Sequence, residues 1–277
     1  MTDPVVIAHR GYAGVAPENT VAAAERAAAD PDTAMLEVDV QPAADGTPVV
    51  FHDARLDGVR DGRPLTDAEG RVWETPLSDL RETRVLGTDQ QVPTLADLFE
   101  AVPATVGVNV ELKNPGTADL RPGESLPEAE RETRRDLWAP FVERVVADCD
   151  AFAGEVLLSS FCEGALAAAR DVAPEYAAAA LVRNDLESGL AVARRYDCEA
   201  VHPPRNAVAG TALAAGSDAG PAGGKPSVDV LAVAHEEGRT VNVWTVENWV
   251  QFDDLAAAGV DGIIADYPGL GRVGGSE

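Results

Sequence analysis

Two acidic residues, Glu37 and Asp39, stand two positions apart in the otherwise apolar stretch Met35–Val40. Successive side chains of a β-strand point to opposite faces, so both carboxylates would lie on the same face if this stretch is a strand. Like charges side by side cost folding energy unless a positive charge lies between them. The spacing therefore indicates a cation site.

Two of the four histidines accompany this segment. The chain turns after Val40 and returns through Pro48–Phe51 to His52, which precedes Asp53, and His9 ends the first apolar run of the chain. The unperturbed pKa of imidazole, near ~6.5, suits both the uptake and the release of a proton at neutral pH. We predict that His9 and His52 are a general acid and a general base, with the assignment of the two roles left open.

A third carboxylate, Glu111, ends a later apolar run and is followed two positions on by Lys113. Together Glu37, Asp39 and Glu111 offer hard oxygen ligands of the kind that Mg²⁺ or Ca²⁺ prefers. The alternative is that these carboxylates form ordinary salt bridges with Arg10 or Lys113. The high cost of uncompensated buried charge favours one divalent cation.

Arg10 and Lys113 are predicted to be the basic groups of the site. A guanidinium beside a metal can hold a phosphate through two parallel hydrogen bonds. An anionic substrate needs such a positive patch to approach a chain whose formal net charge is −25. Trp244 is either a platform for the substrate or an aromatic residue of the core, and the sequence alone leaves both readings open.

The elements that must position these residues alternate between short apolar strands and segments of helical periodicity. The predicted strands are Val5–His9, Met35–Val40, Gly107–Leu112, Val156–Ser160, Ala178–Val182, Ala200–His202, Thr240–Trp244 and Gly262–Ala265. The predicted helices are Val21–Ala29, Thr94–Val102, Thr133–Ala147, Glu163–Val172, Leu186–Arg194, Val228–Glu237 and Asn248–Ala258. This alternation predicts an α/β fold, a closed (β/α)8 TIM barrel, with the polar residues at the carboxyl ends of its strands.

Two segments interrupt the alternation. Residues 54–91 are polar and too long for an ordinary loop, so we expect a small insertion after the second strand that covers the catalytic mouth. Ser217–Pro226 is expected to be a loop before a later helix. Neither resembles a linker, and residues 1–277 are therefore predicted to form a single domain.

The composition excludes several partners. A charge of −25 spread over the chain argues against nucleic acid and against anionic membranes. No apolar run reaches the ~20 residues of a membrane span, and no basic leader opens the sequence. The acidity predicts a cytoplasmic protein of a halophilic organism, with Cys149, Cys162 and Cys198 as buried, reduced side chains. The oligomeric state is left open.

Seven blocks of the sequence carry a resemblance to a known family. They are AHRGYAGVAPENT (8–20), LEVDVQPAADGTPVVFHD (36–53), VPTLADLF (92–99), VNVELK (108–113), SSF (159–161), VNVWTVEN (241–248) and GVDGIIADYP (259–268). In order and spacing they resemble the glycerophosphodiester phosphodiesterase family over nearly the whole chain. The resemblance implies a TIM barrel, a divalent metal on Glu37, Asp39 and Glu111, and a catalytic histidine pair at His9 and His52.

Enzymes of this kind cleave a small-molecule glycerophosphodiester to sn-glycerol 3-phosphate and an alcohol, with Arg10 and Lys113 near the phosphate. The chain departs from the family pattern at Leu56–Arg60 and at Ala265, which leaves the preferred alcohol open. The alternative functions are a lysophospholipase D, a non-catalytic barrel that binds phosphate or a polyol, and a metal-dependent sugar isomerase.

Overall fold

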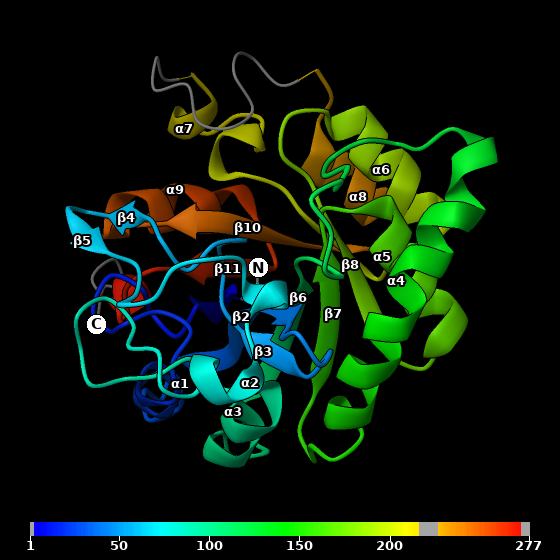
Figure 1. Ribbon diagram of the computed structural model, residues 1–277. Helices are drawn as coiled ribbons and strands as arrows, with labels where there is room; N and C mark the ends of the chain where they lie inside the picture. Colours follow the sequence, from blue (N-terminus) through cyan, green and yellow to red (C-terminus); the bar gives the residue numbers. More distant parts are fainter. Residues whose placement is uncertain (1–2, 216–226, 273–277) are drawn as a thin grey trace.

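Eight parallel strands close into a barrel in the computed structural model, which describes residues 3–215 and 227–272 (Figure 1). The barrel strands are β1 (Val5–His9), β2 (Thr33–Pro42), β6 (Gly107–Leu112), β7 (Val156–Ser160), β8 (Ala177–Leu181), β9 (Ala200–His202), β10 (Thr240–Val246) and β11 (Gly262–Ala265). Neighbouring strands pair in chain order, and β1 pairs with both β2 and β11. The predicted TIM barrel is therefore confirmed.

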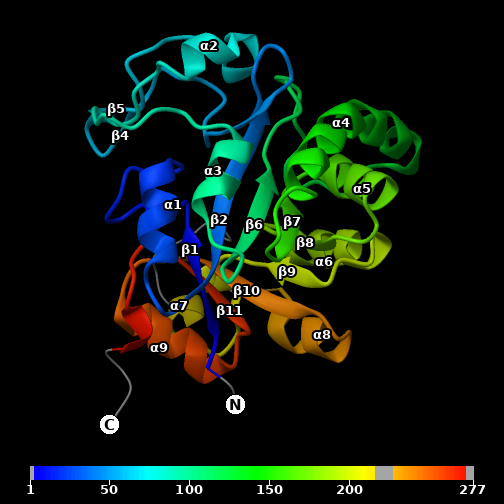
Figure 2. The same ribbon diagram turned by 90° about the horizontal axis from the view of Figure 1, so that it is seen from below.

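Helices surround this barrel (Figure 2). They are α1 (Val21–Ala28), α3 (Leu95–Ala101), α4 (Glu128–Cys149), α5 (Glu163–Val172), α6 (Leu186–Arg195), α7 (Ala212–Ala215), α8 (Val230–Glu236) and α9 (Trp249–Ala258). Several begin at a side-chain cap that accepts a backbone hydrogen bond, such as Thr20 before α1 and Asn248 before α9. Seven of these helices overlap the predicted ones, whereas α7 was not predicted.

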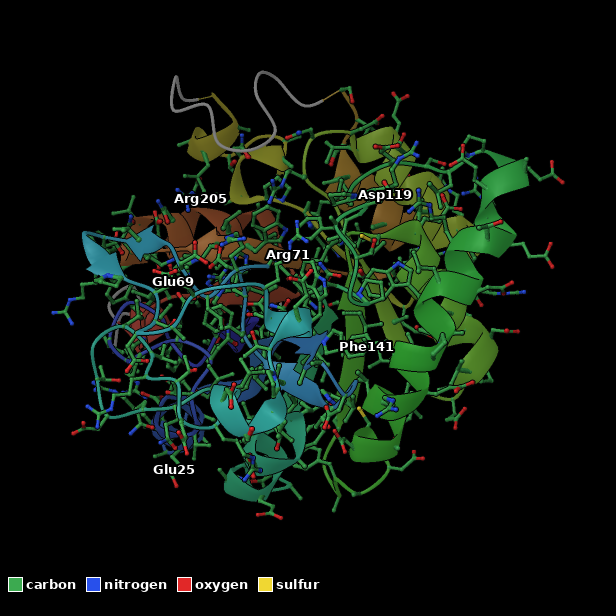
Figure 3. The ribbon with its side chains drawn as sticks, viewed as in Figure 1. Glu25, Glu69, Arg71, Asp119, Phe141 and Arg205 are labelled. Atoms are coloured by element: carbon green, nitrogen blue, oxygen red, sulfur yellow. The ribbon has the colours of Figure 1, made fainter. Side chains whose placement is uncertain are left out.

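Helix α4 is longer than the predicted Thr133–Ala147 because it begins at Glu128. The added first turn is charged and has no apolar periodicity, so the sequence pattern gave no sign of it. Ion pairs outside the helix stabilise this end: Arg131 lies 3.2 Å from Glu163, and Arg134 lies 2.6 Å from Asp119. Further along, α4 turns an apolar face to the strands, and Figure 3 labels Phe141 on that face.

The segment between β2 and α3 contains β3 (Pro48–Val50), which pairs antiparallel with β2, the strands β4 (Val59–Arg60) and β5 (Arg63–Pro64), and a short helix α2 (Leu77–Leu80). The β4–β5 hairpin turns through Asp61 and Gly62, both with positive φ, as a two-residue hairpin loop requires. Figure 2 shows β4, β5 and α2 together at the edge of the molecule opposite α8 and α9.

Residues 54–91 share a small apolar cluster with the neighbouring β3 region, and it includes Val49, Phe51, Leu56 and Leu80. The main core lies between the barrel and its helices, and the three cysteines are free and buried as predicted. No helix of the described residues is both long and apolar enough to cross a membrane. The predicted loop Ser217–Pro226 lies outside the described residues. It contains none of the site residues discussed below.

Candidate active site

Three buried carboxylates from two neighbouring strands form the centre of the site. Glu37 and Asp39 point inward from β2, and Glu111 comes from β6, where it is the register partner of Asp39. One oxygen from each residue lies within 4.8 Å of the other two. The period of two along β2 and the parallel register of β6 therefore produce the predicted cluster, and its donor set suits a hard divalent cation.

The three carboxyl groups differ in their charge preferences. Burial, reinforced by Asp39 and Glu111, raises the pKa of Glu37 well above its usual range. Burial likewise raises the pKa of Glu111. For Asp39 burial acts in the same direction, but Lys113 and Arg10 outweigh it and hold the pKa of that carboxyl well below its usual range. Full ionisation of all three carboxylates is therefore unfavourable, and a bound divalent cation would relieve their mutual repulsion.

Two cations already lie against this cluster. The Lys113 Nζ is 2.8 Å from Glu111 Oε1 and 3.1 Å from Asp39 Oδ1, and the Arg10 Nε is 3.1 Å from Asp39 Oδ2. Burial opposes the charge of both cations, yet the adjacent carboxylates prevail and raise the pKa of each. The salt bridges that the sequence offered as an alternative thus exist alongside the three-carboxylate cluster.

The loop between β1 and α1 brings backbone and side-chain donors to the cluster. Arg10 donates its backbone N–H to Glu37 Oε2 at 3.0 Å, and Asn19 donates its side-chain amide to Asp39 Oδ2 at 2.9 Å. The loop has positive φ at both Arg10 and Gly11. A Cβ on Gly11 would lie 2.8 Å from the backbone of Ala23 in α1, so glycine is required for this close approach.

His9 ends β1 beside the cluster and is held from behind by a carboxylate. Its Nδ1 lies 2.6 Å from Asp266 Oδ1, and its Nε2 lies 3.9 Å from Glu37 Oε2. A carboxylate at Nδ1 favours a proton on that nitrogen and leaves Nε2 to exchange a proton with a ligand. Asp266 follows β11, the last strand, which pairs with β1, the first. The closure of the barrel therefore brings His9 and Asp266 together.

His52 approaches the cluster from the other side. Gln41 donates its side-chain amide to the carbonyls of Phe51 and Asp53, at 2.7 and 2.8 Å, and so fixes the backbone on both sides of the histidine. The His52 Nδ1 lies 3.3 Å from Asp53 Oδ2, which Arg60 of β4 contacts at 2.6 Å. Burial, with a contribution from Lys113, lowers the pKa of His52 against the attraction of Asp39.

One pocket collects the predicted site residues. Its wall includes His9, Arg10, Glu37, His52, Glu111, Lys113, Phe161, Arg183 and Trp244. Asp39 lies beneath this wall. The indole of Trp244 meets Phe161 edge to face, with ring centroids 5.5 Å apart, and donates its Nε1–H to the carbonyl of His202. Trp244 therefore packs on a neighbouring ring and also lines the pocket, and its contact with the substrate stays a prediction.

His202, at the end of β9, is fully buried. Its Nε2 lies 2.9 Å from the Asn242 side-chain amide, and burial lowers its pKa to about 3. The imidazole is accordingly neutral at neutral pH and belongs to the interior of the barrel.

Several residues of the site escaped prediction. Asp266 and Asn19 lie in motifs that were singled out, but their contacts depend on chain segments far apart in sequence. Glu18 accepts hydrogen bonds from Arg10 and Arg60, and Arg60 reaches the site from an inserted hairpin. Glu18 and Asp53 belong to the PENT and HD motifs, whose polar residues could have indicated a role at the site. Nothing in the sequence around Arg60 indicated such a role.

Comparison with known proteins connects this geometry to a family. The family model described as the glycerophosphoryl diester phosphodiesterase family matches residues 9–270. The chain is 28% identical over 273 residues to a glycerophosphodiester phosphodiesterase of Caldanaerobacter subterraneus subsp. tengcongensis, covering 95% of this chain and 94% of that one. A glycerophosphodiester phosphodiesterase of Bacillus altitudinis is 26% identical over 271 residues, with the same shares covered.

Among solved structures, a phosphodiesterase of Oleispira antarctica in complex with the product sn-glycerol-3-phosphate superposes with a TM-score of 0.73. It is 25% identical to this chain, and the match covers 96% of this chain and 94% of the other. The shared architecture therefore extends over the whole barrel, including the strand ends that carry the cluster.

Proposed function

Because the chain belongs to the glycerophosphoryl diester phosphodiesterase family, we propose that it hydrolyses glycerophosphodiesters to a glycerol phosphate and an alcohol. The observation that carries this proposal is a cluster of three buried carboxylates, two of which line one pocket together with both histidines. A phosphodiester is a small anionic molecule, so the site needs positive charge at the phosphorus and proton carriers on either side of it.

We propose that Glu37, Asp39 and Glu111 hold one divalent cation, Mg²⁺ or Ca²⁺. The donor set fits because it consists of carboxylate oxygens within 4.8 Å of one another, and because the pKa of Glu37 is raised by burial and by its two acidic neighbours. Bound there, the ion would neutralise phosphoryl oxygen charge.

His9 and His52 are proposed to carry the protons. Asp266 holds the His9 Nδ1, so the His9 Nε2 is the nitrogen that faces the substrate. Gln41 and Asp53 orient His52 from the opposite side of the cluster. In this proposal one imidazole removes a proton from the attacking oxygen, which belongs to water or to the neighbouring glycerol hydroxyl, and the other protonates the departing alkoxide.

Arg10 and Lys113 are proposed to lie near the phosphate, and Trp244 to contact the substrate's carbon skeleton. Both cations share their charge with carboxylates of the cluster, so they balance the site as well as attract the substrate. A second, outer pocket continues from His9 past Arg60 and Asp61 and offers room for the alcohol. Its charged wall favours a water-soluble alcohol over the long acyl chain of a lysophospholipase D substrate.

Two further proposals concern the setting of the enzyme. We propose that residues 1–277 form one domain, with 54–91 inserted over the mouth, because Arg60 of that segment contacts Asp53 and Glu18 at the site. The net charge of −25 supports a high-salt cytoplasm as its environment. That acidity also disfavours nucleic acid as a partner.

The decisive test is the release of glycerol phosphate from glycerophosphocholine in molar salt. Protein stripped with a chelator should be inactive, and separate addition of Mg²⁺ and Ca²⁺ should restore activity and identify the cation. If folded protein released no product with either ion, hydrolysis of this class of diester would be refuted, and a lysolipid assay would then test the lysophospholipase D alternative.

A further inference from the structure

Arg183 differs from most arginines of this acidic chain. Among residues 3–215 and 227–272, most arginines lie within 4 Å of a carboxylate, as the ion pairs of Arg10 and Arg60 illustrate. Within those ranges no carboxylate and no hydrogen-bond acceptor is recorded for the guanidinium of Arg183, although the side chain lines the reaction pocket. Its charge is therefore free to meet a ligand.

The position of Arg183 is set by the strand that precedes it. The residue follows β8, which is separated from β6 by β7 alone, so Arg183 lies at the carboxyl-end rim of the barrel two strands away from Glu111. The nearest acidic residue along the chain, Asp185, accepts hydrogen bonds from Ser188 at the start of α6. That cap keeps the Asp185 carboxylate occupied.

An aromatic ring supports the guanidinium. The Arg183 Cζ lies 5.4 Å from the centroid of Phe161, and the Lys113 Nζ lies 5.9 Å from the same centroid. A cation beside an aromatic face is stabilised without being neutralised, so its charge stays available to an anion. Phe161 thus links Arg183 to the cation that already touches the carboxylate cluster.

Charge balance explains why the pocket needs this residue. Around the cluster, the carboxylates Glu18, Glu37, Asp39, Asp53, Glu111 and Asp266 outnumber the cations Arg10, Arg60 and Lys113. Each of those cations is in contact with a carboxylate. If these six carboxylates are ionised, a bound divalent cation and the three basic side chains leave a negative excess. An anionic diester has to enter the pocket against that charge.

We propose that Arg183 binds a phosphate oxygen of the substrate, and of the glycerol phosphate product, from the β8 side of the pocket. The inference rests on the proposed function and adds a substrate-binding residue to it. A guanidinium suits this role because it forms two parallel hydrogen bonds to a phosphate and stays charged at every accessible pH.

The test compares three variants in the metal-loaded enzyme. Arg183→Gln should raise KM for glycerophosphocholine about 10- to 100-fold, as expected for the loss of a charge-assisted hydrogen bond, while kcat changes less. The inhibition constant of sn-glycerol 3-phosphate, which carries the phosphate but no second alcohol, should rise at least as much. Arg183→Lys should recover part of the loss because it restores the charge.

Arg144→Gln is the matched control. Arg144 is an exposed arginine of α4 that lines none of the pockets described above and has no carboxylate within 4 Å among the described residues. Removing it changes the net charge by the same amount, and KM should stay within about twofold of the unmodified enzyme. Equal affinity of all variants for Mg²⁺ would show that the cluster is intact.

The proposal would be overturned if Arg183→Gln and Arg144→Gln had the same KM and the same inhibition constant in an active enzyme. Failure of the proposed function looks different, because then the unmodified protein would not cleave the diester at all. In that case calorimetric titration with sn-glycerol 3-phosphate still decides the role of Arg183: weaker binding by Arg183→Gln supports phosphate recognition, and equal binding refutes it.

Discussion

Replacing Glu37 by glutamine should change the free energy of unfolding in opposite directions without and with metal. The substitution keeps the shape of the side chain and an acceptor for the backbone N–H of Arg10, which now donates to Glu37 at 3.0 Å. It removes one negative charge from a buried cluster in which the pKa of Glu37 is raised by burial and by the neighbouring carboxylates Asp39 and Glu111.

The magnitude follows from the geometry of the cluster. Two unit charges separated by the 4.8 Å that bounds the cluster repel by about 3.5 kcal/mol at an effective dielectric constant of ~20. Glu37 has two such neighbours, and the attraction of Arg10 and Lys113 offsets much of the repulsion. We expect Glu37→Gln to stabilise the metal-free protein by about 1–3 kcal/mol.

Metal reverses the order of stabilities. A ligand at 1,000 times its dissociation constant stabilises the folded state by about 4.1 kcal/mol, and the variant should lose most of that gain because it lacks one ligand charge. Urea unfolding in chelator and in excess Mg²⁺ or Ca²⁺ measures both differences. Without metal, the gain in unfolding free energy of Glu37→Gln over the unmodified protein should shrink as the pH falls toward 4.5, the usual carboxyl pKa. Glu37 is then protonated in the unfolded chain as well.

Glu163→Gln provides the matched control. Glu163 is a buried carboxylate outside the cluster, and it is held by the side chains of Arg195 at 2.7 Å and Tyr196 at 2.9 Å. Its replacement should destabilise the protein in chelator and in metal alike. If Glu37→Gln also lowered the free energy of unfolding in chelator, the cluster would not be under electrostatic strain, and the argument for a cation there would be wrong.

Four further predictions address other residues and the solvent. His9→Ala and His52→Ala should each lower kcat by about 10²–10⁴-fold in a diester assay, and near-full activity of either variant would contradict its catalytic role. Asp266→Asn should lower kcat by about 10- to 100-fold with little change in KM, since it acts through His9; an unchanged kcat would remove Asp266 from the site. The pKa of His202 in the folded protein is about 3, against 6.5 when unfolded, so the unfolded chain takes up a proton that the folded protein cannot. The folded protein therefore loses stability as the pH falls below 6.5. The loss of unfolding free energy between pH 7 and pH 5 should therefore be about 2 kcal/mol smaller in His202→Gln, and an equal loss would refute this reasoning. Raising KCl from about 0.1 to 2 M should increase the midpoint of thermal unfolding, because salt screens the self-repulsion of the acidic surface; a constant midpoint would argue against high-salt adaptation.

The barrel was predictable from sequence because its strands are short apolar runs with sharp ends. Six of the eight predicted strands agree with the structure to within about a residue at each end, and β2 and β10 extend further because their added residues pair with neighbouring strands. The start of α4 was not predictable in the same way. Its first turn carries Glu128, Glu130 and Arg131 and little apolar surface, and ion-pair partners such as Asp119 and Glu163 lie outside the helix.

The cluster at the centre of the site was accessible for the same reason. Glu37 and Asp39 share one strand, and Glu111 ends another, so strand periodicity and the barrel rule suffice to bring them together. The partners of the histidines required tertiary information. Asp266 is 257 residues from His9, and Arg60 reaches Asp53 from a hairpin whose placement depends on the inserted segment.

These contacts give the two histidines different surroundings although both stand beside the same carboxylates. His9 is backed by Asp266 alone at 2.6 Å, whereas the carboxylate behind His52 is shared with Arg60 at 2.6 Å. Sharing Asp53 with a guanidinium weakens its attraction for a proton on His52, and burial lowers the pKa of His52 further. The two histidines therefore differ in the carboxylate that holds them, because Asp53 is shared between His52 and Arg60 whereas Asp266 contacts His9.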